Sequence, residues 1–429
     1  MSRTVPAALL LALLASPAMA EEFSFDPAEI EPPALEWGGY AEVKWEHSDL
    51  NQRGALRDLL FYQGPRSTLD RLGTALQLDG RYTRDLAALK WVARATAAQD
   101  ELAWSDTADL YEGYLSLKPA PDFVVDLGKK TFKWGKGYAW NPVGFIDRPK
   151  DPNDPEEALE GFIGAGFDAI RSFAGSPLQT VALTAVALPV WQGVNEDFGA
   201  RDNVNLAAKL YFLFYDTDID LIASTGNSRS SRFGVDFSRN LAANLEIHGE
   251  IAHTPHQSMQ MLDASSMMAT QMVSDTSWLL GLRHLSERDL TTIVEIYHND
   301  DGYTEAEQAR FFDLVADGMA QYESTGATTL LSRAANASQL YSRPQTGRNY
   351  LYARLSQKDP LDILYLNPGL TLIANLDDQS WSLAPEMVYT GFTNWELRLR
   401  LNVVGGDANS EYDEKRNSNT LEARLRSFF

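Results

Sequence analysis

The chain has 429 residues, with 59 acidic against 37 basic side chains, a formal net charge of −22 and no cysteine. The lack of cysteine excludes disulfide scaffolds, Cys-ligated zinc, iron–sulfur clusters and thiol catalysis. The acidic balance argues against nucleic-acid binding, which needs a basic surface. After residue 20 no stretch approaches the roughly 20 consecutive apolar residues of a membrane-spanning helix.

The first twenty residues have the pattern of a secretory signal peptide. A short basic start precedes an apolar stretch at 7–15, and residues 18–20 have the small-x-small pattern that signal peptidase cleaves. We therefore expect residues 1–20 to be removed during export. Residues 21–37 are acidic and rich in proline, which predicts a periplasmic N-terminal segment with no fold of its own.

From residue 38 onward the sequence alternates between apolar and polar residues in runs of about ten. The clearest run is 395–403, in which Trp395, Leu397, Leu399, Leu401 and Val403 share one face and Glu396, Arg398, Arg400 and Asn402 the other. A period of two indicates a β-strand with one apolar and one polar face.

About eighteen such runs follow one another along the chain. They begin near residues 38, 71, 86, 108, 123, 161, 178, 204, 218, 231, 243, 277, 290, 349, 361, 380, 395 and 419. Short connections alternate with long ones, and the long ones are 48–70, 97–107, 135–160, 192–203, 256–276, 301–348 and 406–418. This pattern predicts an all-β fold, a transmembrane antiparallel up-and-down β-barrel of about 18 strands (16–18) over residues 38–429.

Aromatic residues near strand ends support the barrel. An aromatic girdle is predicted from Trp134, Trp191, Trp278, Trp381 and Trp395. The chain ends on Phe429, which resembles the C-terminal membrane insertion signal of bacterial outer-membrane barrels. A soluble sandwich or propeller would also alternate, but a propeller would repeat a motif every 40–50 residues or so, and none is present. We expect the protein in the outer membrane of a Gram-negative bacterium.

The segment 127–143 resembles a recurrent element of Gram-negative outer-membrane porin-like barrels. In those proteins a strand ending in Trp-Gly leads into a loop with Asn-Pro, and the loop often folds into the lumen. The matching residues here are Gly128, Trp134, Gly135, Asn141 and Pro142. The turn 377–380 also looks like this group. The resemblance implies a porin-like barrel and specifies no solute.

The long connection 135–160 is the candidate constriction loop. It is strongly acidic, and four prolines stiffen it. It either projects outward into solvent or folds inward to narrow the pore, and we favour the inward placement that the resemblance implies. The residues assigned to the constriction are Trp134, Asn141, Asp147, Asp151, Asp154, Glu156 and Glu157.

Basic residues gather on the polar faces of strands near both chain ends, which meet where a barrel closes. We term them the basic wall: Lys44, Arg81, Lys90, Arg94, Arg354, Arg398, Arg400, Arg424 and Arg426. A basic wall opposite an acidic loop would set up a transverse field that selects and orients solutes. Alternatively, these charges only solvate the interior and form cross-strand pairs.

The connection 301–348 departs from the β-pattern. Thr304 and Glu307 form a capping box, and apolar residues from Ala309 to Met319 recur at helical spacing. A second helix is possible at 329–340. We expect a partly helical extracellular loop that caps the mouth, plugs the lumen or binds a partner.

Nothing in the sequence indicates catalysis, a metal site or a cofactor. Among six histidines only His253 and His256 lie close together, and as a loop-end pair they fit a solvated position better than a metal site. Phosphate-binding, dinucleotide-binding and zinc-protease motifs are absent.

We therefore expect a porin-like channel for passive or facilitated diffusion of small hydrophilic solutes. The alternatives are a barrel for hydrophobic substrates, with Tyr211, Tyr215 and Tyr352 along the route, a plugged scaffold barrel or, less favoured, an outer-membrane hydrolase. The expected partners are outer-membrane lipid and lipopolysaccharide, a small-molecule solute and the barrel assembly machinery. A homo-oligomer is possible, and no nucleic acid is expected.

Overall fold

The computed structural model describes residues 33–157 and 159–429. The predicted signal peptide and most of the predicted N-terminal segment lie outside the described residues. Residues Leu35–Phe429 form one compact unit. Its first strand begins at Leu35, so residues 35–37 of the predicted N-terminal segment belong to that strand.

Eighteen antiparallel strands are present in the described part of the chain. They are β1 (Leu35–Leu50), β2 (Thr68–Arg84), β3 (Ala87–Asp100), β4 (Trp104–Ala120), β5 (Phe123–Lys130), β6 (Phe162–Ser172), β7 (Leu178–Val190), β8 (Asn203–Phe214), β9 (Thr217–Thr225), β10 (Arg232–Ala242), β11 (Leu245–Leu262), β12 (Met268–Leu285), β13 (Leu290–His298), β14 (Asn349–Gln357), β15 (Leu366–Asn375), β16 (Trp381–Tyr389), β17 (Trp395–Gly405) and β18 (Asn417–Phe428).

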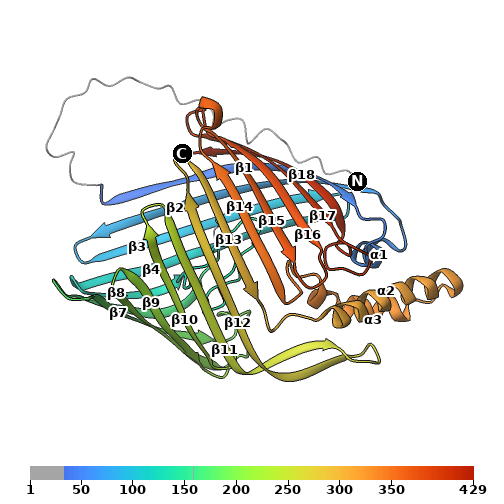
Figure 1. The fold of residues 1–429 in the computed structure, drawn as a ribbon, viewed down its shortest axis with the longest axis horizontal. Helices are drawn as coiled ribbons and strands as arrows, with labels where there is room; N and C mark the ends of the chain where they lie inside the picture. Colours follow the sequence, from blue (N-terminus) through green and yellow to red (C-terminus); the bar gives the residue numbers. More distant parts are fainter. Residues whose placement is uncertain (1–32, 158) are drawn as a thin grey trace. The chain divides into compact units, whose positions relative to one another are not determined.

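Each strand pairs with its neighbours in sequence, and the sheet closes on itself (Figure 1). At the closure Lys44 of β1 lies opposite Arg424 of β18 on one side and Gly73 of β2 on the other. Because the first strand pairs with the last, none of the eighteen described strands is an edge strand of an open sheet. The predicted closed barrel of about 18 strands is therefore confirmed.

Two expected long connections are corrected by the structure. Strands β11 and β12 continue as a paired hairpin as far as Leu262 and Met268, so most of 256–276 is strand. The expected loop 97–107 shrinks in the same way, because β3 and β4 pair up to Gln99 and Trp104. In the β11–β12 hairpin the side chain of Met259 is buried while that of Met272 is exposed. Because apolar residues occupy both faces of this hairpin, its sequence does not alternate between apolar and polar residues, and the strands were not recognised.

The apolar faces of the strands point outward. In β17 the side chains of Leu397, Leu399 and Leu401 are exposed, whereas Arg398 between them is 7% exposed. This orientation follows from the alternation, because a shift of one residue would exchange the two faces. Trp191, Trp278 and Trp381 are on the exposed side, but Trp134 is 3% exposed and lies inside, so its assignment to an aromatic girdle was wrong.

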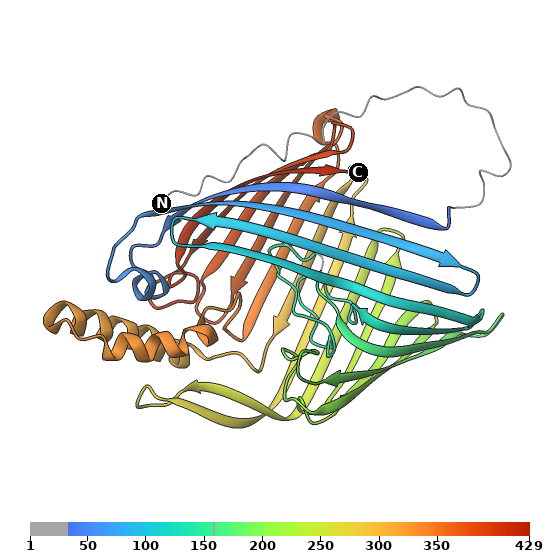
Figure 2. The same ribbon diagram turned by 180° about the vertical axis from the view of Figure 1, so that it is seen from behind.

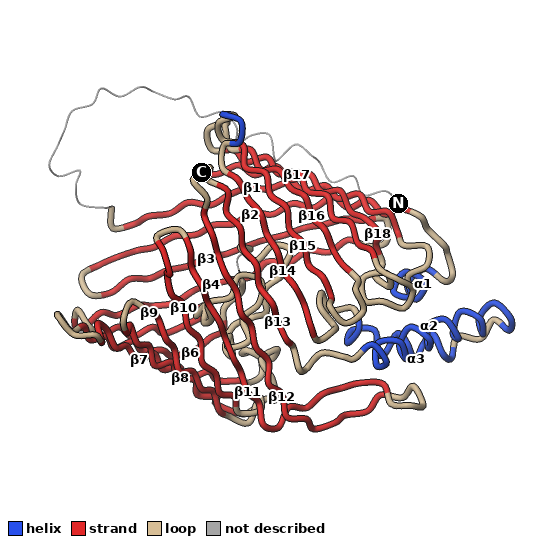
Figure 3. Tube along the Cα trace, viewed as in Figure 1, coloured by secondary structure: helices blue, strands red, loops and turns tan. Residues whose placement is uncertain are grey.

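Three helices lie at the rim that carries the long loops: α1 (Ala55–Phe61), α2 (Glu305–Thr325) and α3 (Thr329–Tyr341). They are blue in Figure 3. The capping box at Thr304 is present as predicted, whereas α1 was expected to be plain loop. Apolar side chains of all three helices pack in one cluster with Met259 and Leu262 of the β11–β12 hairpin. The helix pair thus packs on this hairpin and on α1.

None of the helices described by the structure is both long and apolar enough to cross a membrane.

Candidate functional site

The connection between β5 and β6, residues 131–161, lies inside the barrel, and we call it the lumen loop. It is the teal segment between the strands in Figure 2. Its described residues contact inward-facing side chains of strands far away in the sheet, including Glu250 of β11, Glu295 of β13 and Arg398 of β17. Only a loop within the lumen can reach all three.

Two buried wall carboxylates hold the first half of the lumen loop through its backbone. Oε1 of Glu250 accepts hydrogen bonds from the N–H groups of Lys136 and Gly137, at 2.6 Å each, and Oε2 accepts one from Val143 at 3.2 Å. Glu295 accepts from the N–H groups of Tyr138 at 2.5 Å and Ala139 at 2.9 Å. Hydrogen bonds to an ionised carboxylate are about twice as strong as neutral ones. We call these two residues the carboxylate clamp.

Glycine at position 135 makes this backbone arrangement possible. Gly135 has a φ of +100°, a region that residues with a side chain rarely adopt. A Cβ at this position would collide with the amide of Asn141 and approach the carboxylate of Glu250. The Trp-Gly step thus turns the chain into the clamp, while Asn141 Nδ2 donates to Glu250 Oε1 at 3.2 Å.

Lysines of the lumen loop complete its attachment. Lys136 Nζ lies 3.0 Å from Asp220 of β9 and 3.8 Å from Asp236 of β10. Lys150 Nζ donates to the carbonyl of Gly137 at 2.7 Å, so the second half of the loop braces the first. Burial lowers the pKa of Lys150, because its charged form loses solvation.

The lumen loop also packs apolar side chains against one side of the barrel. Val143, Phe145 and Ile146 are buried in one cluster with inward residues of β6 to β9 and β11. Trp140 is buried in a second cluster and stacks on Tyr297 with ring centroids 4.9 Å apart. Tyr352 belongs to that cluster and is 0% exposed, so it does not line an open route as the hydrophobic-substrate alternative required.

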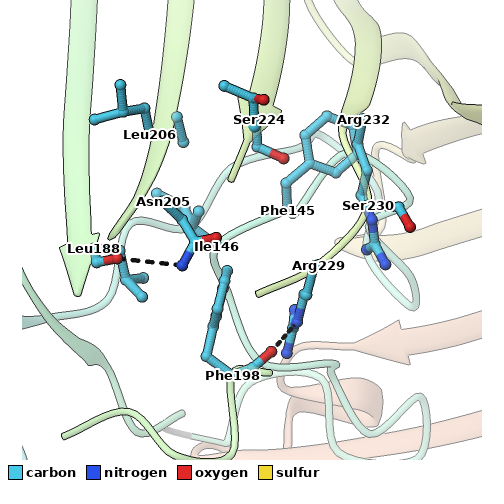
Figure 4. A pocket seen from close by; sticks show the side chains of 12 residues that line it. Phe145, Ile146, Leu188, Phe198, Asn205, Leu206, Ser224, Arg229, Ser230 and Arg232 are labelled. Atoms are coloured by element: carbon cyan, nitrogen blue, oxygen red, sulfur yellow. Dashed lines mark hydrogen bonds between the residues drawn. The ribbon is translucent and has the colours of Figure 1, made fainter. Parts of the chain in front are cut away.

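Little free volume remains on this packed side. The niche in Figure 4 is lined by Phe145, Ile146, Leu188 and Phe198 among others and has a volume of about 10 Å³. Asn205 and Arg229 close it by donating to the carbonyl groups of Leu188 and Phe198. A volume of this size holds about one water molecule.

The opposite side of the lumen loop carries its acidic tip, residues 151–157, which meets the basic wall. One Asp154 oxygen lies 2.9 Å from Arg398 Nη1, 3.7 Å from Arg424 Nη2 and 4.0 Å from Arg400 Nη1. Glu157 pairs with Arg94 at 2.9 Å. The fold therefore brings four of the nine predicted basic-wall residues next to the predicted loop.

A carboxylate that sequence reasoning did not single out organises these arginines. Glu386 of β16 is 8% exposed and pairs with Arg398 and Arg354 at 2.6 Å each and with Arg400 at 3.1 Å. Glu42 similarly holds Arg426 at 2.6 Å. Cross-strand pairing thus fixes the positions of the guanidinium groups, and no signal local to Glu386 in the sequence distinguishes it from other inward acids.

The remaining predicted site residues have other surroundings. Lys44 pairs with Glu46 at 3.2 Å, and Lys90 lies over the ring of Tyr114, opposite Arg81 near the β2–β3 turn. In the loop, Asp147 accepts hydrogen bonds from the backbone N–H groups of residues 132–134, which is a structural role. Glu156 is exposed.

Two larger cavities lie on the side of the basic wall. The first, of about 550 Å³, lies between Asp151 and Asn153 of the lumen loop and strands β1 to β4, β17 and β18. The second, of about 480 Å³, lies beneath α1 and the end of α3. It shares five lining residues with the first, Asn153, Asn402, Arg416, Asn417 and Thr420. Of the basic wall, Arg400 lines the first cavity.

The described residues include no group of three or more His, Cys, Asp or Glu side chains placed to hold a metal ion. His248 contacts Glu295 at 2.9 Å and His253 contacts Thr276 at 2.9 Å.

Several solved structures share the fold of this chain at low sequence identity. No family model matches the sequence, and no curated protein is similar to it. OccAB1 of Acinetobacter baumannii superimposes with a TM-score of 0.55 at 8% identity, covering 92% of this chain and 97% of its own. OccK11 (OpdR) of Pseudomonas aeruginosa gives 0.52 at 11%, covering 92% and 95%. Wzi of Escherichia coli, a carbohydrate-binding β-barrel involved in capsule assembly, gives 0.51 at 7%, covering 90% and 83%.

Proposed function

We propose that the protein is an outer-membrane channel of the porin type, through which small hydrophilic solutes diffuse between the lumen loop and the basic wall. The observation that carries this proposal is the division of the lumen. One side is filled by apolar packing around Val143, Phe145 and Trp140. The other holds two cavities, the first lined by Arg400 and other charged or polar residues and the second by polar and apolar residues together. Flux would follow the solute gradient without any chemical step.

A membrane location is supported by the outer surface of the barrel. Leucines such as Leu399, Leu421 and Leu425 are 37–43% exposed, and similar residues occur on every side of the sheet. A soluble protein rarely exposes so much contiguous apolar surface, because its burial is favourable. In outer-membrane barrels the short turns are periplasmic and the long loops extracellular, so we place α1, α2 and α3 outside the cell.

The constriction role of the acidic tip and the selectivity role of the basic wall are part of the same proposal. Asp154 reaches across from the lumen loop to Arg398, so the two charged surfaces meet at the narrow part of the route. Charged side chains around a pore select ions by sign. The Trp134-Gly135 and Asn141-Pro142 steps support a porin-like origin for this loop.

Conductance of the purified, refolded full chain in a planar bilayer tests the proposed function. We expect stable unitary current steps in KCl and a reversal potential under a salt gradient that defines the ion preference. Protein without the heat-modifiable gel mobility of a folded barrel serves as the negative control. A correctly folded barrel that passes no current would contradict the proposal and favour a plugged or scaffold barrel.

Phe429 is proposed as the insertion signal read by the barrel assembly machinery. Its N–H donates to the carbonyl of Gly39 at 3.1 Å, and its ring lies 6.3 Å from that of Trp37. Replacing Phe429 with Ala should leave these backbone bonds intact while removing the aromatic end. We expect several-fold less protein in the outer-membrane fraction, measured by blotting, with Phe392→Ala as an exposed aromatic control. Equal amounts of the two variants would contradict this role.

A further inference from the structure

The inward faces of the strands at the closure change character from one end to the other. In the middle of the barrel they carry charges such as Arg398, Arg400 and Glu422. Toward the long-loop rim they carry neutral amides and hydroxyls, namely Ser48 of β1, Ser382 of β16, Asn402 of β17 and Thr420 of β18. The charged part of the route is thus preceded by a neutral polar one.

These neutral residues form a hydrogen-bonded band. Ser48 Oγ and Thr420 Oγ1 are 3.0 Å apart, and Asn417 Nδ2 donates to Ser48 Oγ at 3.1 Å. Ser382 Oγ donates to Asn402 Oδ1 at 2.8 Å, which leaves the Nδ2 donors of Asn402 without a hydrogen bond to another described residue. Hydroxyl and amide groups can both donate and accept, so they can exchange these bonds for bonds to a solute.

The 480 Å³ cavity beneath α1 and α3 is lined by the band members Ser382, Asn402, Asn417 and Thr420, whereas Ser48 lines the adjoining 550 Å³ cavity. The lining of the 480 Å³ cavity differs from that of the rest of the route. It includes no Asp or Glu, and nine of its residues are Ser, Thr or Asn: Asn153, Ser338, Ser342, Ser382, Asn402, Asn417, Ser418, Asn419 and Thr420. Apolar surface comes from Leu56, Leu59, Leu60, Val404 and Tyr412. Ligand pockets of roughly 300–1,000 Å³ usually combine apolar walls with a few polar groups that fix orientation.

The two cationic residues at this cavity, Lys415 and Arg416, differ in how far their hydrogen-bonding groups are already used. Lys415 Nζ donates to the carbonyl of Arg343 at 2.7 Å and lies 3.8 Å from Glu411. Arg416 Nε donates to Asn417 Oδ1 at 3.0 Å. The Tyr412 hydroxyl is buried and has no hydrogen-bond partner among the described residues. The lining therefore offers nine neutral polar residues and one guanidinium group, that of Arg416, which has no carboxylate partner among the described residues.

We propose that this cavity is an external binding site for a neutral polyhydroxylated solute of mono- or disaccharide size. The hydroxyl groups of such a solute would replace the hydrogen bonds that Ser382, Asn402 and Thr420 make within the band, and its C–H face would lie on the leucines of α1. A site built from hydrogen-bonding groups discriminates strongly against molecules that leave those groups unpaired. That the solute reaches this cavity from outside the cell rests on the proposed function, which places the long loops on the extracellular side.

The test is block of the KCl current by solute added on the side of the extracellular loops. Maltose is expected to reduce the current with saturation, whereas tetraethylene glycol, which has far fewer hydroxyl groups, should show no saturation. Asn402→Leu and Thr420→Val should each weaken the maltose effect about three- to tenfold, as expected for loss of one hydrogen bond. Thr107→Val is the matched control for Thr420→Val. Like Thr420, Thr107 is hydrogen-bonded to a hydroxyl group on the neighbouring strand, that of Thr96 at 2.9 Å, but it lines neither cavity.

Other outcomes would overturn the inference. Equal, non-saturating effects of maltose and tetraethylene glycol would mean that the cavity is merely filled with water. Block by gluconate but not by maltose, unchanged in Asn402→Leu, would assign recognition to arginines. If no current flows in KCl, the proposed channel function is refuted, but the proposed binding site is not yet tested. Equilibrium dialysis of the detergent-solubilised full chain with labelled maltose then decides the inference, and absence of binding would refute it.

Discussion

Replacing Glu250 and Glu295 together with alanine is expected to raise the single-channel conductance roughly twofold or more, since conductance grows with the open cross-section of a water-filled pore. The two carboxylates accept hydrogen bonds from the N–H groups of Lys136 to Ala139 and of Val143. Without them these donors are left unpaired, and each buried unpaired group costs about 1–3 kcal/mol. The first half of the lumen loop should therefore leave its packed position.

The barrel itself should survive this double substitution. Its closure depends on backbone pairing between strands, including β1 with β18, which the side chains of the clamp do not contribute to. Glu246→Ala is the matched control. Glu246 also lies on β11, two residues before His248, but it accepts a hydrogen bond from the Ser238 hydroxyl rather than from the lumen loop. Heat-modifiable gel mobility monitors folding, and protease cleavage within 131–161 monitors release of the loop. Unchanged conductance with a released loop would show that the loop does not limit the current.

Neutralising Arg398 and Arg400 together, as Arg398→Gln and Arg400→Gln, is expected to shift ion selectivity toward cations. Both arginines lie within 4.0 Å of Asp154 and pair with Glu386. Removing the two arginines leaves the negative charges of Asp154 and Glu386 only partly neutralised by the remaining arginines. A unit charge at about 4 Å is worth around 1 kcal/mol in water, so the potassium-to-chloride permeability ratio should rise about five- to tenfold. Reversal potentials under a salt gradient measure this ratio.

The matched control removes the same charge from another part of the basic wall. Arg81→Gln with Lys90→Gln changes two positive residues that lie opposite each other near the β2–β3 turn. Salt screens exposed charges over about 10 Å at 0.1 M, so this pair should change selectivity less. An equal shift in both double variants would indicate a response to total lumen charge and would contradict a local filter at Asp154. Arg398→Lys tests whether loss of the pairing with Glu386, rather than of charge, disturbs folding.

The course of the strands was predictable because alternation is a local property. Side chains on successive strand residues point to opposite faces, so a run such as 395–403 reveals both the strand and its orientation. Most strands begin within a few residues of the predicted position. The exception at β12, which begins at Met268 rather than near 277, arises where methionines occupy both faces. Helix α2 was also predictable, because its capping box is a local arrangement of Thr304 and Glu307.

The sequence by itself thus determined the barrel, the acidic character of the lumen loop and the basic character of the strands at both chain ends. Only the tertiary structure decided which of these groups meet. Asp154 and Arg398 are 244 residues apart in the chain, and Gly137 and Glu250 are 113 apart. Closure of the sheet sets such distances, because it brings remote strands around one lumen. The choice of Glu250, Glu295 and Glu386 among many inward acids followed from where the lumen loop lies, which no local pattern encodes.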